Sequence, residues 1–330
     1  MARFDIDQTT ETLERDGIVV LPNFLQGAAL ASIQDSFTRA LERPAFNTRS
    51  GYEMIEKWRV QLENLLLIDP HCYSDCALHP LVTEVVRRHV GPDAALVEAR
   101  GWKTIRTLRN FHGWHGDAWF HPSAAATKPR EVKLAVYLTD VTSGHFCYIK
   151  GSHHDNRGVF PRHWGPRDVA PLMGSSQDVK GPAGTAFLFD TAGVHRQTTP
   201  VLEPRDVMFF NYHDPAVPLQ DEDVRAGRYQ PLALNAGFLP EAISPADAKI
   251  LGLGRARSAP AHEGVIGRPE LVRYHLMHKA VAAALAARLE VQEVNRMGRE
   301  IRRAALSRLR GLPARLTGRS GERPAPAAHS

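Results

Sequence analysis

The chain has few cysteines and lacks the apolar segments that direct proteins into or across membranes. Its three cysteines, Cys72, Cys76 and Cys147, are an odd number at no familiar metal-ligand spacing. We therefore expect reduced thiols rather than a disulfide framework. The first residues lack the apolar core of a secretory signal, and no uncharged apolar run approaches the roughly 18 residues of a membrane span. These absences favour a cytoplasmic location.

Basic residues are in excess only near the C-terminus. The net charge is +5 over 330 residues. Nine arginines and two glutamates between Arg296 and Arg323 give this tail +7, which leaves −2 for the rest of the chain. Because the body has no basic surplus for phosphates, the sequence argues against a nucleic-acid partner.

The N-terminal part, residues 1–94, combines helical patterns with one strand. Apolar spacing and terminal signals predict three helices and one intervening strand, and we expect this part to pack on the outside of a β-barrel. The helices are expected over 10–16, 26–41 and 80–90, and the strand over 18–21. Residues 44–70 are polar and irregular, as in a lid or substrate loop.

From residue 95 the pattern changes to short β-rich runs separated by Gly, Pro, Asn and Asp. Such runs at this spacing predict a double-sheet β-barrel or jelly roll over residues 95–215. The runs cover 95–111, 132–139, 145–150, 185–189 and 206–212. The fold class expected is therefore mainly β with flanking helices.

Three further segments follow the predicted barrel. Residues 216–268 read as an irregular connection, 269–317 as a long basic amphipathic helix, and 318–330 as a disordered tail rich in proline and small residues. A basic amphipathic helix can pack on a protein body with its arginines in solvent, which we favour. The alternative is peripheral contact with an anionic membrane.

The candidate chemistry begins in the run 111–120, which contains His115 and Asp117. In a strand, residues i and i+2 point to the same face, so an imidazole and a carboxylate would project together. They would supply two-thirds of the 2-His-1-carboxylate facial triad of non-haem Fe(II) enzymes.

His195 and Arg205 complete the candidate site. His195 lies 80 residues after His115, which leaves room for the intervening strands of a barrel, and it follows a β-rich run and a turn. Arg205 comes ten residues later and opens the last predicted strand. An arginine in this position could bind a carboxylate through two parallel hydrogen bonds.

A second His-x-Asp step, His153-His154-Asp155, competes with the first. Only 42 residues separate His153 from His195, which is short for crossing a barrel, so the spacing favours His115 and Asp117. His112 and His121 lack the i, i+2 relation to Asp117, and we interpret them as exposed or supporting residues.

Other residues on the predicted strands have two interpretations each. Aromatic side chains in strands belong to cores more often than to pockets, and cations there are more often solvated than buried against an anionic substrate. The aromatic residues are Trp102, Trp114 and Trp119, and the cations are Arg106, Arg109 and Lys133. His213 could reach the mouth of the site, but we assign it no role.

Taken in order, these motifs resemble the phytanoyl-CoA dioxygenase (PhyH) family of Fe(II)/2-oxoglutarate oxygenases, from about residue 12 to about 215. The resemblance rests on Gly17-Ile-Val-Val-Leu-Pro, Trp114-His115-Gly-Asp117, Leu138-Thr-Asp140 with Lys150-Gly-Ser-His153, and Gly193-Val-His195 with Arg205. Two departures are the residues Gly116, where the family often has Gln, and His145, where it often has Pro.

The resemblance implies a double-stranded β-helix (a cupin-like jelly roll) with Fe(II) bound by His115, Asp117 and His195. It implies that Arg205 binds the far carboxylate of 2-oxoglutarate, that O2 is the oxidant, and that His153 is not a ligand. Halogenase relatives lose the carboxylate ligand, so Asp117 favours hydroxylation over chlorination.

We therefore expect an enzyme that hydroxylates an unactivated C–H bond of a small-molecule or carrier-linked substrate and releases succinate and CO2. The same site could instead direct desaturation, cyclisation or epimerisation. A non-catalytic jelly-roll binding module is the alternative from another class, and it would leave the four residues together without a purpose.

Overall fold

The chain forms two units, Met1–Ala283 and Ala284–Ser330. The computed structural model describes residues 4–41, 59–62, 64–108, 113–117, 130–156, 163–214, 232–239, 242–253 and 262–266, and scattered positions between Leu276 and Leu306. The strands described all belong to the first unit. The finer division of the chain that the sequence suggests stays a prediction.

The first unit begins with a capped helix that leads directly into a strand. Helix α1 (Ile6–Asp16) starts at Asp5, which accepts a hydrogen bond from the Gln8 N–H, and it ends at Gly17 with φ +75°. A Cβ at Gly17 would lie 2.4 Å from His153 Nδ1, so both backbone conformation and space require glycine there. Strand β1 (Ile18–Leu21) follows at once, as predicted.

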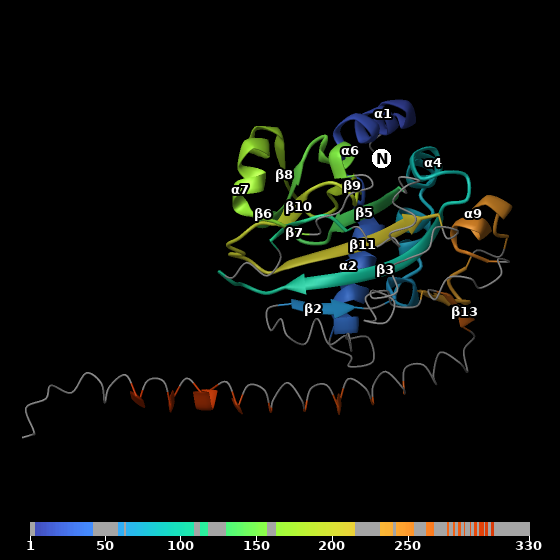
Figure 1. The fold of residues 1–330 in the computed structure, drawn as a ribbon. Coiled ribbons are helices and arrows are strands. Elements are labelled where there is room, and N and C mark those ends of the chain that lie inside the picture. Colours follow the sequence, from blue (N-terminus) through green and yellow to red (C-terminus); the bar gives the residue numbers. More distant parts are fainter. Residues whose placement is uncertain are drawn as a thin grey trace, which may run out of the picture. The chain divides into compact units, whose positions relative to one another are not determined.

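Two sheets make up the core of this unit (Figure 1). The larger has the order β1-β9-β5-β11-β3-β2 and the smaller β7-β4-β10-β6-β8. The remaining strands of the larger sheet are β2 (Arg59–Leu62), β3 (Ala95–Thr104), β5 (Glu131–Tyr137), β9 (Ala186–Asp190) and β11 (Arg205–His213). The strands of the smaller sheet are β4 (Trp114–His115), β6 (Val141–Ile149), β7 (His163–Trp164), β8 (Ser176–Gly181) and β10 (His195–Gln197).

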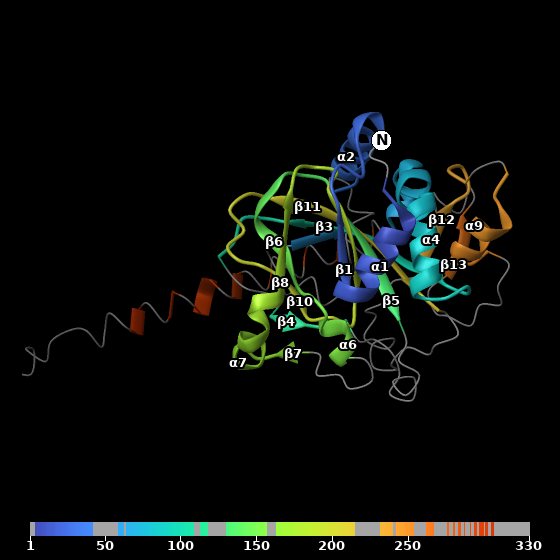
Figure 2. The ribbon, with the colours of Figure 1, turned by 90° about the horizontal axis from the view of Figure 1, so that it is seen from above.

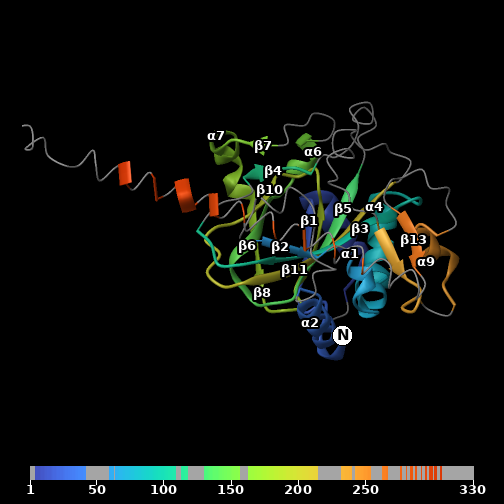
Figure 3. The ribbon, with the colours of Figure 1, turned by 90° about the horizontal axis from the view of Figure 1, so that it is seen from below.

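The larger sheet is buried on both faces. Its outer face packs on helices α1, α2 (Gly27–Leu41) and α4 (Pro80–His89), and one apolar cluster joins Phe37, Leu134 and Phe210 there. Its inner face packs on the smaller sheet, because Phe146 of β6 belongs to the same apolar cluster as Phe187 of β9 and Val207 of β11. Figures 2 and 3 show β4 and β10 on one side of this sheet and α2 on the other. The predicted class, mainly β with flanking helices, is confirmed.

The structure corrects two expectations of irregular backbone. Within residues 44–70, β2 pairs with β3 at the sheet edge and a buried 3₁₀ turn covers Leu65–Leu67; residues 42–58 lie outside the described part. Within 216–268, β12 (Leu232–Asn235) pairs in parallel with β13 (His262–Ile266), and α9 (Pro245–Ile250) lies between them in sequence. Strands of four or five residues, such as β2, β12 and β13, are too short to show a clear period in the sequence.

Described positions between Leu276 and Leu306 are helical. Apolar side chains among them are exposed, with Met297 at 45% and Ile301 at 70%. Within the described part of the chain, no helix is both long enough and apolar enough to cross a membrane. The tail 318–330 lies outside that part.

Candidate functional site

The three predicted metal ligands lie together at the pairing of two short strands. In the antiparallel pair of β4 and β10, His115 lies directly opposite His195, and their ring centroids are 4.5 Å apart. Asp117 follows two residues after His115. One ligand atom from each of the three side chains lies within 4.8 Å of the others.

Backbone carbonyls orient both imidazole rings in the same way. Nδ1 of His115 donates to the Gly113 carbonyl at 2.7 Å, and Nδ1 of His195 donates to the Gly193 carbonyl at 2.8 Å. Each Nε2 faces Asp117 at 3.7 Å, from His115 to Oδ1 and from His195 to Oδ2. A histidine with its Nδ1 proton fixed on a carbonyl presents the Nε2 lone pair that metals bind.

The turn between β9 and β10 carries the backbone acceptors for this arrangement. Thr191 O accepts the N–H of Asp117 at 2.8 Å, and Gly193 O accepts from His195. The carboxylate of Asp190 accepts the Ala192 N–H at 3.0 Å. Its other oxygen lies 3.0 Å from Nε2 of the buried His89 on α4. No sequence pattern indicates this contact between helix α4 and the turn, because it joins residues about 100 positions apart.

Burial and local charge set the protonation of the site. Burial, and after it the neighbouring His195, lowers the pKa of His115 to about 4. Burial alone would raise the pKa of Asp117, but Lys133 and His195 hold it well below its usual range. At neutral pH the site therefore offers a neutral His115 imidazole and an ionised Asp117.

Lys133 faces the site, contrary to the expected solvated outer face. Its Nζ lies 2.6 Å from Asp117 Oδ2, and only 11% of its side chain is exposed. The expectation is wrong for Lys133, because alternation along β5 directs it inward. Arg106 is exposed as expected, and Arg109 lies outside the described residues.

Arg205 is buried at the start of β11, where the sequence placed it. Its exposure is 3%, its Nη1 donates to the Gly144 carbonyl at 2.6 Å, and its guanidinium lies 5.8 Å from the centre of the Tyr137 ring. A series of aromatic rings connects this region to the triad. The ring centroid of Phe146 lies 5.2 Å from that of His195 and 4.8 Å from that of Phe187. The Phe187 centroid in turn lies 5.5 Å from that of Tyr137. A row of aromatic side chains in the interior thus leads from the imidazole of His195 to the buried guanidinium of Arg205.

The sequence matches the phytanoyl-CoA dioxygenase (PhyH) family over residues 13–198, more than half of the chain. The chain belongs to this family. It is an Fe(II)- and 2-oxoglutarate-dependent dioxygenase, and the family match favours an enzyme over a binding module. His115, Asp117 and His195 lie within the matched range, whereas Arg205 lies seven residues beyond its end.

Solved structures with a similar arrangement include two enzymes of low sequence identity. HygX from Streptomyces hygroscopicus, with nickel, 2-oxoglutarate and hygromycin B bound, is 18% identical with a TM-score of 0.47, over 62% of this chain and 86% of that chain. The non-heme alpha ketoglutarate dependent epimerase SnoN from nogalamycin biosynthesis is 19% identical with a TM-score of 0.48, over 64% and 83%. No curated protein sequence matches the chain.

The competing His-x-Asp step of this PhyH-family chain takes no part in the triad. His153 lies on helix α6 (Ser152–Asn156), where residues i and i+2 do not share a face. Its Nε2 lies 3.0 Å from the Glu14 carbonyl. Among the described residues, the group that could hold a metal comprises His115, Asp117 and His195 alone.

The remaining candidates fall into supporting positions or outside the described part. Trp114 is buried, with the Arg196 guanidinium 4.3 Å from its ring centre, and Trp102 packs 4.8 Å from Phe209 on the inner face. His145 pairs with Asp178 at 3.1 Å. The buried His213 is the last residue of β11, the strand that begins with Arg205. Residues His112, Trp119 and His121 lie outside the described residues.

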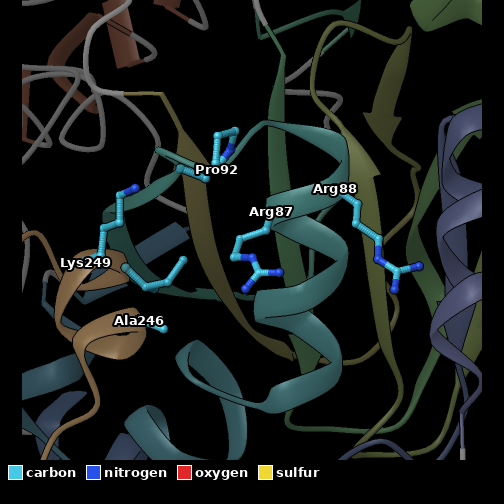
Figure 4. Close-up of a pocket in the computed structure, with 7 residues that line it drawn as sticks. Arg87, Arg88, Pro92, Ala246 and Lys249 are labelled. Carbon is cyan, nitrogen blue, oxygen red and sulfur yellow. The ribbon is translucent and has the colours of Figure 1, made fainter.

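A separate cavity of about 330 Å³ lies where α4 and α9 approach each other (Figure 4). Its lining includes the cations Arg87, Arg88 and Lys249. These are paired with carboxylates, Arg87 and Arg88 with Glu84 and Lys249 with Asp93. The cavity contains no residue of the triad, and its paired cations leave little charge for an anionic ligand.

Proposed function

We propose that His115, Asp117 and His195 hold Fe(II) in a 2-His-1-carboxylate site on a double-stranded β-helix. The observation that carries this proposal is the convergence of three ligand atoms within 4.8 Å, with both Nδ1 protons fixed on carbonyls. Two imidazole nitrogens and one carboxylate oxygen fit the donor set of non-haem Fe(II) oxygenases, and they leave coordination positions open for co-substrate and O2.

Arg205 is proposed to bind the far carboxylate of 2-oxoglutarate. Support comes from its burial and from the row of aromatic side chains between it and His195, because a buried arginine recognises carboxylates through paired hydrogen bonds. These aromatic rings would keep water from the carbon chain of a bound co-substrate. When bound, iron and 2-oxoglutarate supply the activation of O2, with release of succinate and CO2.

The proposed reaction is hydroxylation of an unactivated C–H bond in a small-molecule or carrier-linked substrate. The carboxylate of Asp117 supports this outcome over chlorination, since a halide needs the position that the carboxylate fills. Desaturation, cyclisation and epimerisation use the same ligand set. Product analysis of a single-turnover reaction separates these outcomes from hydroxylation.

Anaerobic titration with Fe(II) and 2-oxoglutarate tests the site directly. A chelated Fe(II)–2-oxoglutarate pair gives a weak visible charge-transfer band, which we expect in the wild type. His195→Ala should abolish the band because it removes a ligand. Arg205→Ala should weaken it by raising the concentration of 2-oxoglutarate needed to form it.

Matched substitutions away from the site serve as controls. His154→Ala and Arg167→Ala remove an exposed histidine and an exposed arginine, and both should leave the band unchanged. Absence of the band in the wild type, together with absence of iron binding, would refute the assignment. A band that survives His195→Ala would exclude His195 as a ligand.

Peripheral membrane contact of the C-terminal helix, the alternative to packing on the protein body, stays untested, as does the cytoplasmic location. Its motivation is the arginine-rich sequence with exposed Met297 and Ile301. If the helix contacts membranes, anionic liposomes should co-sediment the full chain but not a chain ending at Gly298. Equal sedimentation of the two would refute membrane contact.

A further inference from the structure

Lys133 brings a cation to the proposed metal site from the sheet opposite its ligands. Its ammonium lies 2.6 Å from Asp117 Oδ2, and both side chains are nearly buried, at 11% and 12% exposure. Lys133 stands in β5 opposite Asn211 of β11 and Phe189 of β9. The larger sheet thus contributes none of the three proposed ligands but contributes a positive charge to one of them.

This charge makes the proposed donor set electrically neutral. The two histidines bind a metal as neutral imidazoles, and Lys133 compensates the negative charge of Asp117. A divalent ion must therefore share its carboxylate with an ammonium group that repels it. In a buried site this repulsion is screened less than it would be in water.

The same ammonium should favour an anionic co-substrate. 2-Oxoglutarate carries two negative charges, and at a metal-loaded site it meets the dication together with Lys133. The lysine thus lowers the affinity of the site for the metal alone and raises the affinity of the metal-loaded site for dianionic 2-oxoglutarate. Two ligands with this relation increase each other's affinity by the same factor.

We propose that Lys133 couples the binding of Fe(II) and 2-oxoglutarate through its charge. It weakens the hold of the triad on the metal alone and strengthens the hold of the metal-loaded site on 2-oxoglutarate. The inference rests on the metal-site assignment proposed above. Lys133 acts through Asp117 and through the local field, so it is a positioning residue.

A purely structural role makes a different prediction. Lys133 would then only satisfy the hydrogen bond of a buried carboxylate, and a neutral donor of similar reach could replace it. Lys133→Gln keeps a donor and removes the charge, whereas Lys133→Arg keeps both. The two variants therefore separate charge from hydrogen bonding.

The experiment measures two dissociation constants in each variant. Calorimetry gives the affinity for Mn(II) alone and the affinity of the Mn(II)-loaded protein for 2-oxoglutarate. In Lys133→Gln we expect Mn(II) alone to bind about tenfold tighter and 2-oxoglutarate about tenfold weaker, a size typical of coupling between sites. Lys133→Arg should stay within about twofold of the wild type for both, because it keeps the charge.

Lys103→Gln is the matched control, because Lys103 also pairs with an aspartate of the larger sheet, Asp206, at 3.2 Å. It should change neither constant. If Lys133→Gln matches the wild type or weakens both ligands, the inference is overturned. Failure of the wild type to bind Mn(II) and 2-oxoglutarate would instead refute the metal-site assignment itself.

Folding of the charge-deleted variant gives a second readout. Without Lys133 the buried Asp117 lacks its cation, so Mn(II) should raise the melting temperature of Lys133→Gln by more than it raises that of the wild type. Lys133→Met should behave in the same way. An equal rise, or variants that stay unfolded with Mn(II) present, would mean that the lysine is structural.

Discussion

The strands of the larger sheet that form the core differ in length and burial from the strands of the smaller sheet that carry the candidate site. Strand β11 of the larger sheet has nine residues, all buried, and pairs along its length with β3 and β5. In the smaller sheet, β4 has two residues and β10 has three. These short strands carry His115 and His195, whereas the long strands carry the bulk of the apolar core.

Ladder hydrogen bonds of such short strands cannot by themselves hold the side chains of the proposed site in place. The turn Asp190–Gly193 does so instead, because Thr191 O and Gly193 O accept from Asp117 and His195. This turn leaves β9 of the larger sheet and is fixed by its contact with His89. The larger sheet therefore acts as the scaffold. The turn that follows its strand β9 holds Asp117 and His195 in place.

Removing a large side chain from the scaffold should have the largest effect on stability. Phe210 is fully buried on the outer face of β11. Phe210→Ala should lower the free energy of unfolding by about 3–5 kcal/mol, from lost burial and the cavity left behind. Urea unfolding in EDTA measures this loss. The affinity of the folded fraction for Mn(II) should stay near that of the wild type.

Phe146→Ala gives the matched substitution in the smaller sheet. Phe146 is 6% exposed and stacks on His195 at 5.2 Å. Its loss should therefore weaken Mn(II) binding as well as stability. If Phe210→Ala weakened metal binding as strongly as Phe146→Ala, the division between scaffold and site would be wrong.

The same difference explains which elements could be predicted from the sequence. The run 206–212 marks β11, observed as Arg205–His213, because a long apolar run bounded by turn residues indicates a buried strand. Strands β7 and β10 gave no such signal, since two or three residues contain no period. Only tertiary pairing defines them.

The convergence of the triad was predictable, but its counter-charge was not. A His-x-Asp step and a distant histidine led to His115, Asp117 and His195, and the structure brings these together. Lys133 alternates with Val132 and Leu134, which pack against helices. Sequence alternation alone cannot distinguish a solvated face from an inner face that meets a polar site, so the sequence predicts a solvent-exposed Lys133.

Substitution in the turn should have an intermediate effect that falls on the site. A Cβ at Gly193 would lie 1.8 Å from Tyr148 Oη and 2.2 Å from its Cζ, so either the turn or Tyr148, which donates to the turn at Asp190 O, must shift. Gly193→Ala should cost about 1–3 kcal/mol of stability, as overpacking does. It should also weaken Mn(II) binding, because the displaced carbonyl orients His195.

Gly113 provides a close control for this prediction. Its carbonyl orients His115 just as that of Gly193 orients His195, but a Cβ at Gly113 would meet no atom of the described residues within 4 Å. Gly113→Ala should leave stability and Mn(II) affinity close to those of the wild type. Equal losses in the two variants would show that the glycines matter for chain flexibility rather than for space.

The smallest expected effect concerns the link between helix α4 and the turn. His89 lies between Glu14 at 2.7 Å and Asp190 at 3.0 Å. Burial would lower the pKa of His89, but hydrogen bonds to Asp190 and Glu14 outweigh this and raise it. Its stabilising contribution is therefore complete below the ordinary histidine pKa of about 6.5 and is lost as pH rises through the raised pKa of the folded state.

Comparison of the wild type with His89→Gln isolates this contribution. In EDTA, the stability difference between them should shrink at alkaline pH, at no more than about 1.4 kcal/mol per pH unit. Metal affinity of the wild type should weaken relative to His89→Gln over the same interval, because the turn that positions Asp117 and His195 loses its charged support. His71→Gln, which breaks a surface pair with Asp75, should change metal affinity at no pH. A difference between wild type and His89→Gln that is independent of pH would show that His89 supports the turn by packing rather than by charge, so that helix α4 and the turn are held together at this point by shape alone.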